Sequence, residues 1–183
     1  AEQKQTKKAG DVSHWHEIVV NICNTIYNPV SAEVTSTTVK EMLEEGLLLK
    51  NLHEQVIVKL PCTAEGIEVC HDLSNAGVAV NMTLCFNVAQ AVMASNAGAF
   101  YISPFVGRLD DYTAGSGVQL VKDIANVYAG SMSKTKILAA SIRNVEHLNQ
   151  VAPYADIATC PPKIIWDIFK HKLTVGGVET FMN

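Results

Sequence analysis

Val56-Ile57-Val58-Lys59-Leu60-Pro61 is an apolar run that contains a single amine. A run of this length and composition predicts a buried strand. A lysine inside such a strand loses hydration, which disfavours its ammonium form, and an uncharged amine can attack a carbonyl to form a Schiff base. The strand alone leaves a second interpretation open, in which the lysine lies at an exposed edge with its stem packed and its head in water.

Similar apolar runs alternate with longer helical patterns along the chain. The predicted strands are 30–34, 55–60, 79–83, 99–104, 136–142 and 157–159. The predicted helices are 15–27, 37–52, 64–76, 88–97, 117–130, 145–151 and 162–171. This alternation predicts an α/β fold made of right-handed βαβ units around a parallel sheet. The strands are continuously apolar, as expected for a sheet that is covered by helices.

Composition narrows the class of protein. The chain has 183 residues, of which 48% are hydrophobic and 17% charged, values typical of a globular domain. A net charge of −4 argues against general nucleic-acid binding, and the apolar runs are too short to cross a membrane. The amino end does not resemble a signal peptide. The five cysteines lack zinc-ligand spacing, so we expect no metal. Their odd number and lack of pairing favour a reducing compartment. No glycine-rich dinucleotide motif opens a helix, so we expect no cofactor.

Two arginines stand out among the 14 basic residues. Arg108 and Arg143 are the only arginines in the sequence, and each follows a predicted strand. If those strands are neighbours, the two guanidinium groups converge, and such forks bind phosphate oxygens in a bidentate way. The alternative is pairing with a nearby carboxylate, for which Asp110 and Asp111 are candidates.

Several motifs, taken in order, resemble one family. They are Ser31-Ala32-Glu33-Val34, Val58-Lys59-Leu60-Pro61-Cys62-Thr63-Ala64-Glu65-Gly66, Asn81-Met82-Thr83-Leu84, Tyr101-Ile102-Ser103-Pro104-Phe105-Val106-Gly107-Arg108-Leu109-Asp110-Asp111, Ala139-Ala140-Ser141-Ile142-Arg143 and His171-Lys172-Leu173-Thr174. Together they are similar to the small transaldolases and fructose-6-phosphate aldolases, from about residue 10 to residue 183.

The resemblance implies a (β/α)₈ TIM barrel that performs class I, Schiff-base chemistry on sugar phosphates, without a metal. It implies that Lys59 forms the imine, and that Glu33 moves protons through a water that Thr83 helps to hold. Donor-binding and phosphate-binding roles are implied for a further set: Asn81, Ser103, Phe105, Arg108, Ser141 and Arg143.

Two positions distinguish the reaction types within this family. The aldolases typically carry glutamine at the position of Glu33 and tyrosine at that of Phe105, so this chain resembles the transferases. A phenyl ring cannot protonate the enamine, which then waits for an acceptor aldehyde. We therefore expect a transaldolase of the pentose phosphate pathway in the cytoplasm, with a fructose-6-phosphate aldolase or an impaired barrel fragment as the alternatives.

The sequence also departs from the family pattern. The segment that carries the first two strands and the cleavage aspartate has no counterpart, and residues 1–5 stand where the loop of the second strand is expected. The resemblance therefore predicts one domain over residues 1–183, truncated at both ends, with six of the eight strands. We expect little turnover from this chain alone, better retention of imine formation, and assembly as a homo-oligomer.

Overall fold

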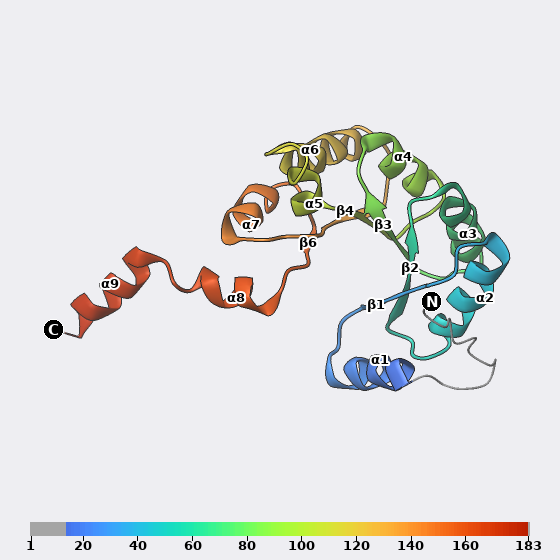
Figure 1. Ribbon diagram of the computed structural model, residues 1–183, viewed down its shortest axis with the longest axis horizontal. Coiled ribbons are helices and arrows are strands. Elements are labelled where there is room, and N and C mark those ends of the chain that lie inside the picture. The colour runs from blue at the N-terminus through green and yellow to red at the C-terminus, as the bar shows by residue number, and fades with distance from the viewer. Residues whose placement is uncertain (1–13, 183) are drawn as a thin grey trace, which may run out of the picture.

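The computed structural model describes residues 14–182, and the chain forms a curved parallel sheet wrapped by helices (Figure 1). The elements follow in the order α1 His14–Thr25, β1 Val30–Glu33, α2 Val39–Lys50, β2 Val56–Pro61, α3 Ala64–Asn75, β3 Val80–Cys85, α4 Val88–Asn96, β4 Tyr101–Pro104, α5 Val106–Asp110, α6 Ser116–Ala129, β5 Lys136–Ala139, α7 Val145–Val151, β6 Ile157–Ala158, α8 Pro162–Ile168 and α9 Lys172–Phe181. Residues 1–5, which were expected to stand at the position of the second strand's loop, lie outside the described residues.

The sheet has the order β1-β2-β3-β4-β5-β6, and every neighbouring pair is parallel. Helices α2, α3, α4, α6 and α7 lie along the convex side of its curve (Figure 1). The six strands thus form a curled half-barrel, which confirms the predicted α/β class and an incomplete (β/α) barrel. Because all strands run the same way, their carboxyl ends meet along one rim.

Alternation along the strands separates two faces. Val58, Leu60, Met82 and Ile102 are fully buried in the apolar cluster between the strands and the helices. The residues between them belong to the inner face, where polar side chains collect. Part of the sequence signal for a site is therefore an isolated polar residue, such as Lys59 or Ser103, within an otherwise apolar strand.

Local capping sets the starts of several helices. Thr63 caps α3, since its Oγ1 accepts a hydrogen bond of 3.0 Å from Gly66 N. Gly77 and Gly98 have φ of 79° and 88°, the left-handed conformation common after helices. Gly66 is required near the start of α3, because a Cβ there would lie 1.9 Å from Pro61 O.

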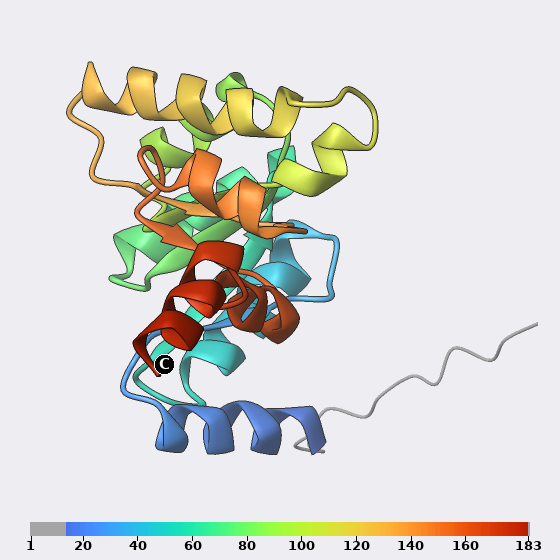
Figure 2. The same cartoon turned by 90° about the vertical axis from the view of Figure 1, so that its left-hand side faces the viewer.

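The structure corrects the boundaries near the carboxyl end. The strand predicted over 136–142 ends at Ala139, shortly before Ser141, whose φ of 58° breaks the extended chain. The helix predicted to end at His171 stops at Ile168, and His171 instead caps α9 by accepting from Leu173 N. Helix α5 was not predicted. Figure 2 shows α8 and α9 in front of the sheet. None of the helices within residues 14–182 is long and apolar enough to span a membrane.

Candidate active site

Three polar residues form a row across the inner rim. Strand register pairs Glu33 with Lys59 and Lys59 with Asn81. Lys59 Nζ lies 2.9 Å from Glu33 Oε2, and the two side chains are 24% and 46% exposed. The Lys59 side chain is thus partly buried. Its aliphatic part lies within the sheet, and its amine contacts the Glu33 carboxylate at a distance that allows proton exchange.

Behind this pair lies a partly buried hydrogen-bond chain. Ser103 Oγ on β4 donates to Asn81 Oδ1 at 2.7 Å, and Asn81 Nδ2 donates to Ser31 Oγ on β1 at 3.1 Å. Both Asn81 and Ser103 are almost completely buried. The chain spans four strands and fixes the Asn81 amide beside Lys59.

Thr83 and Tyr101 complete the inner face. Thr83 is fully buried, and its hydroxyl has no hydrogen-bond partner among the atoms of residues 14–182. Such a hydroxyl fits the predicted role of holding a water, because buried polar groups are rarely left unpaired. Tyr101, which the sequence analysis did not select, lies opposite Asn81 in the register. Burial, and secondarily the Asp156 carboxylate, raises the pKa of Tyr101.

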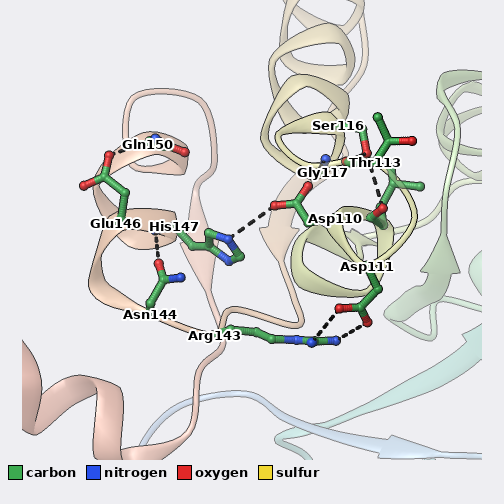
Figure 3. A network of polar contacts seen from close by, with 11 residues as sticks. Asp110, Asp111, Thr113, Ser116, Gly117, Arg143, Asn144, Glu146, His147 and Gln150 are labelled. Carbon is green, nitrogen blue, oxygen red and sulfur yellow. Dashed lines mark hydrogen bonds and ion pairs between the residues drawn. The ribbon is translucent and has the colours of Figure 1, made fainter.

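The two arginines occupy different surroundings. Arg143 Nη1 and Nη2 donate to Asp111 Oδ1 and Oδ2 at 2.8 and 2.7 Å (Figure 3). Arg108 forms no ion pair with any described residue, and its guanidinium carbon lies 5.1 Å from the centre of the Phe105 ring. The predicted alternative of carboxylate pairing therefore holds for Arg143 and not for Arg108.

Backbone geometry brings the second arginine against α5. Gly107 N donates to Ser141 O at 3.0 Å, and a Cβ on Gly107 would lie 2.4 Å from that oxygen and 2.6 Å from Arg143 Cγ. Only glycine allows this approach. The loop after β5 and the short helix after β4 are thus held together as one unit, which carries Arg108, Ser141 and Arg143.

A cleft of about 650 Å³ opens beside this unit. Its lining includes Ser141, Arg143, Thr159, Pro161 and Lys163. This volume lies in the range of small-molecule sites. Within the described chain, no group of three or more His, Cys, Asp or Glu could hold a metal ion.

The predicted residues therefore form two neighbouring groups along the rim. Glu33, Lys59, Asn81, Thr83 and Ser103 lie on strands β1 to β4, and the remaining four, Phe105, Arg108, Ser141 and Arg143, follow β4 and β5. β4 joins the groups, because Ser103 and Phe105 lie two residues apart. The sequence suggested Asp111 as a carboxylate beside Arg108, but in the structure Asp111 pairs with Arg143.

Comparisons with known proteins show the family of the chain. A probable transaldolase of Caulobacter sp. (strain K31) is 44% identical over 167 residues, which cover 91% of this chain and 76% of the relative. A probable transaldolase of Brucella anthropi is 43% identical with the same coverage. The family model described as Transaldolase/Fructose-6-phosphate aldolase matches residues 3–181. With an amine on the inner face of a parallel half-barrel and two arginines farther along its rim, the chain belongs to the transaldolase/fructose-6-phosphate aldolase family.

Proposed function

We propose that this protein transfers a dihydroxyacetone unit between sugar phosphates through a Schiff base on Lys59. The donors are sedoheptulose 7-phosphate and fructose 6-phosphate, and the acceptors are glyceraldehyde 3-phosphate and erythrose 4-phosphate. The main support is the contact of 2.9 Å between Lys59 Nζ and Glu33 Oε2 on the inner face of a parallel half-barrel. The names of the curated relatives, probable transaldolases, favour the same reaction.

The proposed reaction begins when the Lys59 amine adds to the ketone of the donor. Glu33 accepts and returns the protons that this addition and the loss of water require. Thr83 holds a second water, through which these protons pass between Glu33 and the substrate. The imine draws electrons from the neighbouring carbon–carbon bond, which breaks as the hydroxyl on the far carbon gives its proton to water. An aldose phosphate leaves, and a three-carbon enamine remains on Lys59. The enamine carbon attacks the acceptor aldehyde, whose oxygen takes a proton from water, and a further water hydrolyses the new imine to free the product and the amine.

The surrounding polar groups position the donor. Asn81 and Ser103 contribute an amide and a hydroxyl to the donor hydroxyls, from a partly buried hydrogen-bond chain that limits their motion. Arg108, Ser141 and Arg143 hold the phosphate, so that binding far from the reacting carbon orients the carbonyl toward Lys59. Phe105 lies beneath the Arg108 guanidinium and cannot protonate the enamine.

A trapping experiment tests the proposal. The protein is incubated with fructose 6-phosphate, reduced with borohydride and mapped by mass spectrometry. A three-carbon adduct on Lys59 supports both imine formation and cleavage, and a six-carbon adduct supports imine formation. An adduct confined to other lysines, or the absence of any adduct, would overturn the assignment.

A second assay separates the two activities within the family. A transaldolase consumes fructose 6-phosphate only when an acceptor such as erythrose 4-phosphate is present. Release of free dihydroxyacetone without an acceptor would instead identify an aldolase. Glu33 and Phe105 favour the transferase, because the family resemblance associates glutamine and tyrosine at these positions with the aldolases.

We further propose that the protein works in the cytoplasm, in sugar-phosphate metabolism, and assembles with copies of itself. Exposed apolar side chains on α8 and α9 support assembly: Trp166 is 67% and Phe181 90% exposed. Light scattering coupled to gel filtration should give a mass above the 19.8 kDa of one chain. A monomer at all concentrations would contradict this part of the proposal.

A further inference from the structure

We propose that Asp111 is a positioning residue for phosphate recognition: it fixes the Arg143 guanidinium in the orientation that receives the substrate phosphate. This inference rests on the proposed function, and it assigns a role to a residue that makes none of the proposed substrate contacts. The observation behind it is the bidentate pair between Arg143 and Asp111 (Figure 3).

The pair leaves Arg143 able to contact a ligand. A guanidinium has five N–H groups in one plane, and Asp111 takes one from each terminal nitrogen. The second N–H of each terminal nitrogen remains, and because these two point to opposite sides of the guanidinium, a phosphate oxygen can accept from one of them. The Nε side is less accessible, because the Arg143 stem lies directly against the Gly107 backbone. Asp111 and a phosphate can therefore occupy Arg143 together.

The backbone that carries Asp111 is tied to its surroundings through the preceding residue. The preceding residue, Asp110, accepts a hydrogen bond of 2.7 Å from Gly117 N at the start of α6 through Oδ1. Its Oδ2 lies 3.3 Å from His147 Nε2 on α7, and both side chains are largely buried, at 17% and 13% exposure. Figure 3 shows Asp110 reaching toward His147 on α7 and Asp111 reaching toward Arg143 in the loop before α7. α5 is thus tied to both neighbouring helices, and Asp111 moves with that unit.

Arg143 needs such a partner. Its side chain is half exposed, and a free arginine of this kind samples many rotamers that binding would have to restrict. The bidentate contact with Asp111 removes part of that freedom before substrate arrives. Arg108, which lacks a carboxylate among the described residues, keeps its full charge for the phosphate. We infer a division of roles, in which Arg108 supplies net charge and Arg143 supplies geometry.

The test compares a phosphorylated ligand with one that lacks phosphate. Borohydride trapping on Lys59 is measured as a function of concentration for fructose 6-phosphate and for dihydroxyacetone. We expect Asp111→Asn to raise the half-saturating concentration of fructose 6-phosphate about tenfold, with the plateau and the dihydroxyacetone curve unchanged. Asp111→Glu, which keeps the charge, should recover part of the loss. Asp72→Asn, an exposed aspartate on α3, is the matched control and should match the wild type.

The outcomes separate this inference from the proposed function. If the wild-type protein forms no Lys59 adduct with either ligand, the proposed function fails. If adducts form but Asp111→Asn shifts both ligands equally or neither, the positioning role is wrong. Tighter binding of fructose 6-phosphate by Asp111→Asn would show that Asp111 competes with phosphate, and would also overturn the inference. Thermal unfolding of each variant shows whether a change in both curves comes from loss of fold.

Discussion

Ser103 Oγ donates a hydrogen bond of 2.7 Å to Asn81 Oδ1, and both residues are almost fully buried. Ser103→Ala leaves that carbonyl oxygen without its partner in a site from which protein packing excludes most solvent. We expect a loss of about 1–3 kcal/mol in the free energy of unfolding, measured with urea. Ser95→Ala is the control, since it breaks a 2.7 Å contact with Ser133 that is only partly buried. An equal loss in both variants would contradict the importance of burial.

Glu33→Gln tests the proton-transfer role. The amide retains the shape and one hydrogen bond to Lys59 but cannot carry a proton between water and substrate. We expect the rate of Lys59 adduct formation to fall about 100-fold, with less than a threefold change in the half-saturating concentration of fructose 6-phosphate. Glu68→Gln, on the exposed side of α3, should behave as the wild type. A rate unchanged by Glu33→Gln would remove the carboxylate from the mechanism.

The two arginines should respond differently to loss of Asp111. Arg143→Gln leaves the Asp111 carboxylate unpaired beside the phosphate, so the double variant with Asp111→Asn should bind fructose 6-phosphate several-fold more tightly than Arg143→Gln alone. Arg108→Gln and Asp111→Asn share no direct contact, so their effects on binding free energy should add. Calorimetric titration with fructose 6-phosphate measures both cycles. Additivity in both would argue against the Arg143–Asp111 coupling.

Glu45 gives a pH-dependent prediction. Partial burial would raise the pKa of its carboxyl, but hydrogen bonds from Ser36 and Thr35 together outweigh burial and lower that pKa below 4.5. A group with a lowered pKa in the folded state contributes stability above its unfolded pKa and loses it as pH falls through the folded value. Glu45→Gln should therefore cost about 1 kcal/mol at pH 7 after solvent screening, and less as the pH falls below 4. Urea unfolding at several pH values measures the difference, and Glu44→Gln, which is exposed, is the control. A difference that does not depend on pH would show that the carboxylate charge is not involved.

The sequence was sufficient for the α/β class and for the approximate positions of the strands because both depend on local patterns. Lys59, Asn81 and Ser103 each interrupt an apolar strand, and a parallel sheet necessarily places such residues on a shared face. The partner of each side chain was harder to predict. Asp110 and Asp111 are adjacent in sequence and next to Arg108, yet they contact His147 and Arg143, because α5 turns both carboxylates toward the segment after β5. That turn depends on the close approach of Gly107 to Ser141, which no periodicity reveals.

Gly107→Ala tests this approach directly. The added Cβ would lie 2.4 Å from Ser141 O, 2.6 Å from Arg143 Cγ and 2.7 Å from Arg143 Nε, so either the backbone or the arginine must move. We expect a stability loss of about 1–3 kcal/mol, as for overpacked sites. Relative to the wild type, the affinity for fructose 6-phosphate should fall more than the affinity for dihydroxyacetone. Gly176→Ala is the control: a Cβ there meets nothing within 4 Å, and alanine within α9 should leave stability unchanged or raise it by up to about 1 kcal/mol. If Gly107→Ala keeps both its stability and its affinity for fructose 6-phosphate, then the contact between α5 and the loop after β5 does not set the position of Arg143, and the orientation of that guanidinium must depend on Asp111 alone.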